Sequence, residues 1–108
     1  MNIQIHRHPG SDVAALAGEI DGSTAPLVRE AVAPLLAPGA VTRIDMTGVH
    51  YLSSAGLRAL LLLQREAEAR GALLILSGIS REIRGVMSST GFLGFFQLEG
   101  SALGEIAG

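Results

Sequence analysis

The fold is decided by residues 45–63, which read Asp-Met-Thr-Gly-Val-His-Tyr-Leu-Ser-Ser-Ala-Gly-Leu-Arg-Ala-Leu-Leu-Leu-Leu. Residues 41–46, which lead into this stretch, form a short apolar-rich run that predicts a strand. The second half of the stretch is apolar over a helical length and holds no β-branched residue, which predicts a helix. Ser53 and Ser54 therefore stand at a turn from a strand into a helix.

A serine at such a turn can have a structural role or a regulatory one. Its side-chain oxygen can cap the helix by accepting a hydrogen bond from an amide two or three residues further along. A phosphate attached to it would also be stabilised, because the first amides of a helix are free and the helix dipole is positive at that end. The turn is therefore a candidate switch position.

The same residues resemble the signature of STAS domains, the bacterial anti-sigma factor antagonist family. The resemblance is sharpest in Asp45–Val49 and Tyr51–Leu57, and it extends from about residue 13 to residue 98. In that family the serine two residues before the glycine is phosphorylated by a partner kinase, which is itself the anti-sigma factor. In this chain that serine is Ser54. The family often has Asp at the place of Ser53, so the resemblance implies that Ser53 caps the helix or orients the turn.

The resemblance implies a protein-binding regulator, not an enzyme. The unphosphorylated form is expected to bind an anti-sigma factor serine kinase and so free a sigma factor. Phosphorylation of Ser54 would end that binding until a phosphoserine phosphatase reversed it. The alternative is a STAS domain that is never phosphorylated and serves as a fixed subunit of a lipid-transport or chemosensory assembly.

The expected partner-binding surface combines the serine turn with a second loop. The Gly-Glu-Ile-Asp piece that ends at Asp21 is similar to the Gly-Glu-Leu-Asp of many STAS domains, where the following loop lies beside the phosphoserine turn. For Asp21, an ordinary turn-forming role is an equal alternative. The expected partner-binding residues are Asp21, Gly22, Ser53, Ser54, Ala55, Gly56 and Arg58.

The composition narrows the class of protein. A chain of 108 residues fits one domain, residues 1–108, and 48% hydrophobic with 17% charged residues is enough for a core. The absence of cysteine excludes disulfides, thiolate metal sites and thiol catalysis. No apolar run reaches the ~18 residues of a membrane span, and the N-terminus lacks the layout of a signal peptide. These features predict a cytoplasmic protein.

Nucleic-acid, metal, cofactor and hydrolase functions are not expected. All eight basic residues are scattered arginines in a chain of net charge −2, which gives no basic tract for phosphate backbones. His6 and His8 have no third metal ligand nearby, and nucleotide-binding fingerprints are absent. The nucleophile elbow of an esterase needs a glycine where this chain has Leu52.

The whole pattern predicts a single small STAS-like α/β domain. It has a mixed β-sheet, an N-terminal antiparallel hairpin and about three helices. The predicted strands are residues 2–7, 13–20, 41–46, 72–76 and 95–98, with 72–76 parallel to 41–46 and buried on both faces. The predicted helices are residues 23–37, 54–70 and 81–89. Pro34 is expected to fray or kink the last turn of the first helix, Gly71 to stop the second and Ser80 to cap the third.

Apolar spacing predicts which side of each helix faces the core. The first helix is predicted to turn Leu27, Ala31, Pro34 and Leu35 to one side. In the second, Leu57, Leu60, Leu61, Leu63 and Ala67 form the apolar face and Gln64 belongs to the wet one. In the third, Ile83, Val86 and Met87 point inward.

Overall fold

A five-stranded mixed sheet, with β3 at its centre, carries the helices of this small α/β domain. The computed structural model describes residues 1–99. The sheet order is β1-β2-β3-β4-β5, with β1 antiparallel to β2 and every other neighbouring pair parallel. The N-terminal hairpin and the parallel pairing across the long helix are therefore confirmed. The strands are β1 (Asn2–His8), β2 (Ser11–Ile20), β3 (Val41–Leu52), β4 (Leu73–Ser77) and β5 (Gln97–Glu99).

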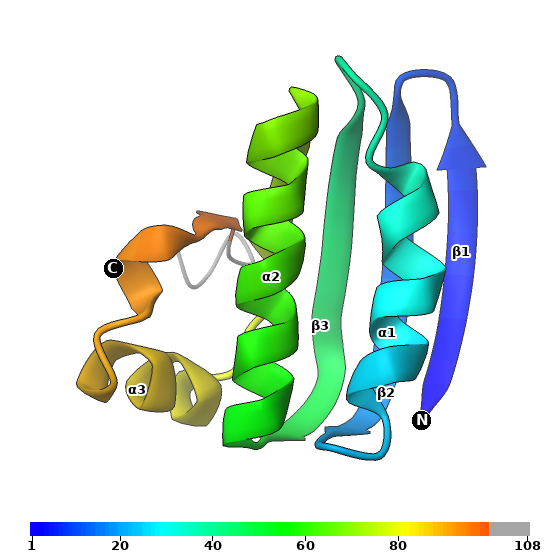
Figure 1. Ribbon diagram of the computed structural model, residues 1–108. Coiled ribbons are helices and arrows are strands. Elements are labelled where there is room, and N and C mark those ends of the chain that lie inside the picture. Colours follow the sequence, from blue (N-terminus) through cyan, green and yellow to red (C-terminus); the bar gives the residue numbers. More distant parts are fainter. Residues whose placement is uncertain (100–108) are drawn as a thin grey trace.

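The helices cover one face of this sheet, as Figure 1 shows for α1 and α2. They are α1 (Ala25–Val32), which continues into the 3-10 turn η1 (Ala33–Leu35), α2 (Ser54–Arg70), α3 (Arg81–Ser89) and the 3-10 turn η2 (Leu93–Phe95). The core lies between the two layers. Its largest fully buried side chains include Ile20, Leu36, Ile44, Met46, Leu60, Leu63, Leu74, Leu76 and Met87.

The central strand is twice as long as the sequence pattern predicts. β3 does not end at Met46 but continues to Leu52, so the predicted end of this strand is wrong. Two register shifts against β2 each add one residue to β3, and such bulges bend a strand without ending it. Gly48 lies at the first bulge, where a Cβ would be only 2.9 Å from the Cβ of Ala17. The glycine therefore serves a close approach between strands.

β3 extends beyond the point where β1 and β4 stop pairing, and its extension carries the serine turn. β1 pairs with β2 only as far as Ala17, and β4 pairs with β3 only as far as Asp45. Beyond these points the register joins Gly18–Ile20 to Val49–Leu52 alone. The strands thus narrow to a two-stranded parallel ribbon that leads into α1 on one side and α2 on the other.

The helix boundaries follow the predicted start and stop signals. Ser53 caps α2 and Ser80 caps α3, each accepting a hydrogen bond from an amide three residues further along. Gly71 ends α2 with a left-handed conformation, φ 74°. α1 ends at Val32 and Pro34 lies in the 3-10 turn η1, so the expected disturbance of the last helical turn takes the form of a 3-10 turn and not of fraying. These signals are local, and they act here as they do in isolated helices.

The faces of the long helix are predicted only in part. Leu60 and Leu63 are fully buried, as expected. Gln64 is also buried, so its assignment to the wet face is wrong. The buried side of α2 is broad because the helix packs against α1 as well as the sheet.

The predicted faces of the other two helices need correction as well. In α1 the buried residues are Ala25, Val28 and Val32, while Leu27 is largely exposed. In α3, Val86 is 44% exposed instead of inward. β4 is buried on the helix face only, since Leu73 is 43% exposed on the other.

Candidate functional site

The site is built around the first turn of α2, where two consecutive serines have different surroundings. The hydroxyl oxygen of Ser53 accepts a hydrogen bond from the amide of Gly56 at 3.1 Å. The amide of Ser53 donates to the carbonyl of Ile20 at 2.9 Å, which ties the start of α2 to the end of β2. Ser53 therefore has a structural role at this turn, as predicted from its position.

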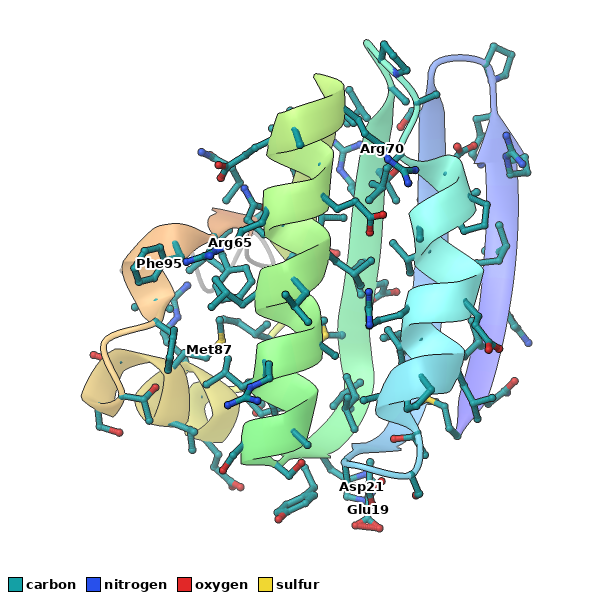
Figure 2. The ribbon with its side chains drawn as sticks, viewed as in Figure 1. Glu19, Asp21, Arg65, Arg70, Met87 and Phe95 are labelled. Atoms are coloured by element: carbon teal, nitrogen blue, oxygen red, sulfur yellow. The ribbon has the colours of Figure 1, made fainter. Side chains whose placement is uncertain are left out.

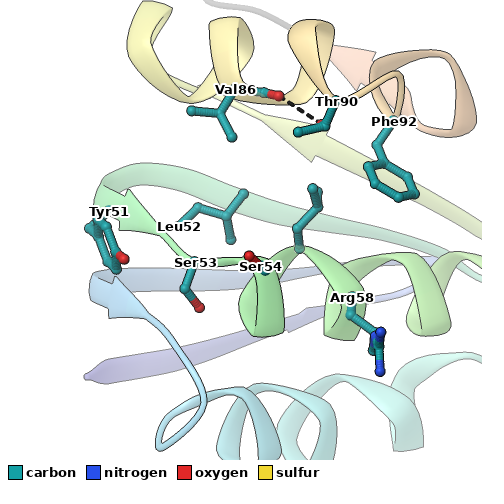
Figure 3. Close-up of a pocket in the computed structure, with 9 residues that line it drawn as sticks. Tyr51, Leu52, Ser53, Ser54, Arg58, Val86, Thr90 and Phe92 are labelled. Carbon is teal, nitrogen blue, oxygen red and sulfur yellow. Dashed lines mark hydrogen bonds between the residues drawn. The ribbon is translucent and has the colours of Figure 1, made fainter.

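Ser54, the first residue of α2, is exposed instead. Within residues 1–99, no hydrogen bond engages its hydroxyl. Figure 3 shows that this hydroxyl points toward the space between α2 and α3, while that of Ser53 points the other way. The hydroxyl of Ser54 is thus accessible from solvent, at the end of α2 where the first amides of a helix have no partner within the helix.

Gly56 lets α2 start close to the backbone of β2. A Cβ at this position would overlap the carbonyl oxygen of Ile20 and would lie 2.8 Å from the Cγ2 of Ile20. It would also lie 2.9 Å from the Cδ1 of Leu52. Real Cβ atoms do not approach other heavy atoms so closely, so the position requires glycine. The two loops of the candidate surface are held together at this contact.

The loop from β2 to α1 forms the second part of the site. One carboxylate oxygen of Asp21 accepts hydrogen bonds from the hydroxyl of Ser23 at 2.7 Å, from its amide at 2.9 Å and from the amide of Thr24 at 3.2 Å. These bonds, led by that from the Ser23 hydroxyl, lower the pKa of Asp21 below the ordinary value of an aspartate. Asp21 therefore has the turn-forming role, and its part in partner binding stays a prediction.

The two loops meet at Gly22 and Ala55. A Cβ on Gly22 would lie 3.9 Å from the Cβ of Ala55, which is ordinary van der Waals contact. Glu19 and Asp21 lie next to each other at the same end of the molecule, as Figure 2 shows. The structure thus brings the predicted loop and the serine turn into one surface.

A groove opens beside Ser54, between the start of α2 and α3. Its volume is about 380 Å³. Val86 and Phe92 face it from the α3 side, and Leu52 faces it from the end of β3 (Figure 3). The full lining is Tyr51, Leu52, Ser53, Ser54, Leu57, Arg58, Val86, Thr90 and Phe92.

Six of the nine groove residues were not predicted as site residues, namely Tyr51, Leu52, Leu57, Val86, Thr90 and Phe92. Tyr51, Leu52 and Leu57 belong to the stretch that resembles the STAS signature but were not expected to bind a partner, and Val86 was assigned to the core from its helical spacing. The hydroxyl of Thr90 donates to the carbonyl of Val86 at 2.7 Å, which closes the last turn of α3 beside the groove. The residues of α3 lie beside the serine turn because α3 packs against β3. This packing is a tertiary feature, so no local pattern in the sequence predicts it.

Residues 1–99 hold neither a cluster of metal-ligand side chains nor a helix that could span a membrane. No group of three or more His, Cys, Asp or Glu side chains in residues 1–99 is arranged to hold a metal ion. Among the helices of these residues, none has the length and apolar character needed to cross a bilayer. The site combines the exposed hydroxyl of Ser54, the N-terminus of α2 and a groove lined largely by apolar side chains.

Comparison with known proteins places this geometry in context. The sequence model of the STAS domain matches residues 2–102. The anti-sigma-B factor antagonist of Listeria monocytogenes is 34% identical over 94 residues, covering 86% of this chain and 82% of the relative. The anti-sigma-B factor antagonist of Bacillus subtilis is 26% identical over 106 residues, covering 98% of this chain and 97% of the relative.

The solved structures include the phosphorylated form of SpoIIAA, a Bacillus cell fate determinant. It superimposes with a TM-score of 0.70 at 21% identity, covering 98% of this chain and 96% of that one. At this level of identity the likeness demonstrates a common fold. The mixed sheet, the hairpin and the three helices are therefore those of a known architecture.

Proposed function

The chain belongs to the STAS domain family, and from this premise we propose that it is an anti-sigma factor antagonist switched by phosphorylation of Ser54. In its unphosphorylated form it binds an anti-sigma factor serine kinase in the cytoplasm and thereby frees a sigma factor. The kinase supplies the nucleotide and phosphorylates Ser54, and a phosphoserine phosphatase restores the binding form. The chain itself acts by binding and not by catalysis. The two relatives named as anti-sigma-B factor antagonists support the general class.

The observation that carries this proposal is the contrast between the two serines. Ser53 is engaged as the helix cap, while Ser54 is exposed one residue later with its hydroxyl directed toward the space between α2 and α3. A kinase can reach the second hydroxyl without unfolding the first turn of α2. The cap would stay intact after modification, so the fold would not need to change.

The switch follows from the charge that a phosphate adds. A phosphoserine brings about −1.5 to −2 charges at neutral pH, and its oxygens can be stabilised by the free amides of a helix N-terminus. The same charge at the centre of a protein interface is costly, because it must lose its water. Phosphorylation of Ser54 therefore blocks the partner and leaves the domain folded.

The test is phosphopeptide mass spectrometry after incubation with ATP and each anti-sigma factor kinase of the same organism. We expect phosphate on Ser54 and none in the Ser54→Ala variant, which should still fold and bind. Ser54→Asp should fold as well but bind at least ~10-fold more weakly, which corresponds to ~1.4 kcal/mol. Phosphate on Ser53 alone would move the site by one residue.

The rival within the same family is a STAS domain that is never phosphorylated. Such a domain would serve as a fixed subunit of a lipid-transport or chemosensory assembly, with a partner held permanently. If neither serine is modified by any of these kinases, the switch is wrong and this fixed-subunit function replaces it. The binding measurements then separate the two, since a fixed partner would be insensitive to Ser54→Asp.

A further inference from the structure

We propose, resting on the proposed function, that the groove between α2 and α3 anchors an apolar side chain of the anti-sigma factor that is flanked by a carboxylate. The groove lies beside Ser54 and shares that residue with the candidate switch. It therefore extends the recognition surface from the two loops onto α3. The proposal names the kind of partner segment that the surface accepts.

The shape and lining of the groove suit one protruding side chain. Five of its nine lining residues are apolar or aromatic, namely Tyr51, Leu52, Leu57, Val86 and Phe92. Tyr51 and Val86 remain 49% and 44% exposed, so the groove is open at its rim. A small ligand is usually enclosed over most of its surface, whereas protein interfaces place an apolar anchor in an open pocket rimmed by polar groups. The groove matches the second case.

The positive charge of Arg58 at the rim of the groove favours a carboxylate next to the apolar side chain of the partner. Arg58 is the one charged residue among those that line the groove, and it is exposed. Within residues 1–99 its guanidinium makes no ion pair. A carboxylate beside the apolar side chain of the partner would complement this charge, because paired opposite charges favour docking in one orientation. The partner segment is therefore apolar and acidic, not apolar and basic.

The position of Ser54 couples the groove to the switch. Ser54 and Arg58 are separated by four residues on α2, a spacing that places side chains on the same face of a helix. A phosphate on Ser54 would thus compete with the partner carboxylate for Arg58. It would also place a strongly hydrated group at the mouth of an apolar groove, which opposes insertion of the anchor.

The test compares two matched substitutions on exposed apolar residues. Val86→Ser removes one apolar side chain from the α3 side of the groove, and Leu62→Ser changes a residue on α2 that is 42% exposed and lies outside the groove. The probe is a purified anti-sigma factor kinase of the same organism that retains the wild-type chain. We expect Val86→Ser to weaken its binding about 10-fold, as loss of an anchor contact does, and Leu62→Ser to change it less than about 2-fold. Circular dichroism checks that both variants fold.

Two further variants test the pocket and the charge separately. Val86→Trp fills the groove with a larger side chain and should prevent the apolar side chain of the partner from entering it. We therefore expect Val86→Trp to weaken binding as Val86→Ser does. Arg58→Gln should weaken binding about 3-fold to 10-fold and flatten its dependence on salt, because screening acts on the lost charge pair. A steeper salt dependence in Arg58→Gln than in the wild type would contradict the carboxylate.

The outcomes separate this proposal from the function on which it rests. If a kinase binds the wild type, Val86→Ser and Val86→Trp equally well, the anchor is wrong and the antagonist function stands. If Leu62→Ser weakens binding as much as Val86→Ser, the partner docks elsewhere on α2 and the groove assignment is likewise overturned. If no kinase retains the wild-type chain, the proposed function fails and the anchor fails with it.

Discussion

Replacing Gly56 with alanine should destabilise the domain although alanine is the better helix former. At an open helical position this change stabilises a protein by up to about 1 kcal/mol. At Gly56 the added methyl would overlap the carbonyl oxygen of Ile20 and would lie 2.8 Å and 2.9 Å from methyl groups of Ile20 and Leu52. The carbonyl belongs to the backbone of a strand, so it cannot rotate away as a flexible side chain would.

The expected change in the free energy of unfolding is the sum of two destabilising contributions and one stabilising contribution. Overpacking of a close contact costs about 1–3 kcal/mol. Displacing the Ile20 carbonyl also weakens its hydrogen bond from the Ser53 amide, 2.9 Å long, and a typical bond of this kind contributes about 1 kcal/mol. After subtraction of the gain in helix propensity, we expect Gly56→Ala to lower the free energy of unfolding by about 1–3 kcal/mol.

Gly85 provides a matched control in the same molecule. It lies in the interior of α3, and a Cβ there would meet no atom within 4 Å. Gly85→Ala should therefore stabilise the domain by about 0.5–1 kcal/mol. Urea denaturation followed by circular dichroism measures both variants against the wild type. A Gly56→Ala variant as stable as Gly85→Ala would refute the steric reasoning at the start of α2.

Three further predictions concern the core, the cap and the Asp21 turn. Leu60→Ala and Leu63→Ala remove fully buried side chains and should each cost about 2–5 kcal/mol in urea denaturation, whereas a loss below about half a kcal/mol would place that side chain outside the core. Ser53→Ala removes the cap of α2 and should lower the free energy of unfolding by about 1 kcal/mol in the same assay. An unchanged midpoint of urea denaturation would contradict this role of Ser53. Ser23→Ala removes the main cause of the lowered pKa of Asp21, so that pKa should rise in an NMR titration of the carboxyl carbon, and an unmoved midpoint would show that the amides alone hold it down. Because the folded pKa lies below the unfolded value of about 3.9, the stabilisation from this turn is present above that pH and is lost as the pH falls through the folded pKa.

Short-range signals in the sequence predicted correctly where the second and third helices begin and where the second one ends. The caps at Ser53 and Ser80 and the stop at Gly71 depend on side chains and backbone preferences within a few residues. Local chemistry decides the caps and the helix stop, so they can be recognised without knowledge of the tertiary structure. The different roles of Ser53 and Ser54 as cap and exposed hydroxyl were expected instead from the resemblance to STAS domains.

Features that depend on neighbouring elements were predicted poorly. Each bulge in β3 adds a residue and reverses the alternation of inside and outside positions, so the strand pattern is lost after Met46. Val86 has the spacing of a core residue, yet the elements around α3 leave it on the wall of a groove. Gln64 looks solvent-facing by polarity, but the side of α2 to which it belongs is covered. None of these outcomes is encoded within one segment.

The narrowing of the sheet beyond Ala17 and Asp45 sets how the molecule opens under native conditions. Amides in the middle of β3, around Ile44, have a strand on both sides and should exchange with deuterium only through global unfolding. In the two-stranded ribbon of Gly18–Ile20 and Val49–Leu52, one local separation frees every inter-strand amide at once. Protection against exchange should therefore fall stepwise toward the serine turn, so that the recognition surface lies on a part of the sheet that opens locally, without global unfolding.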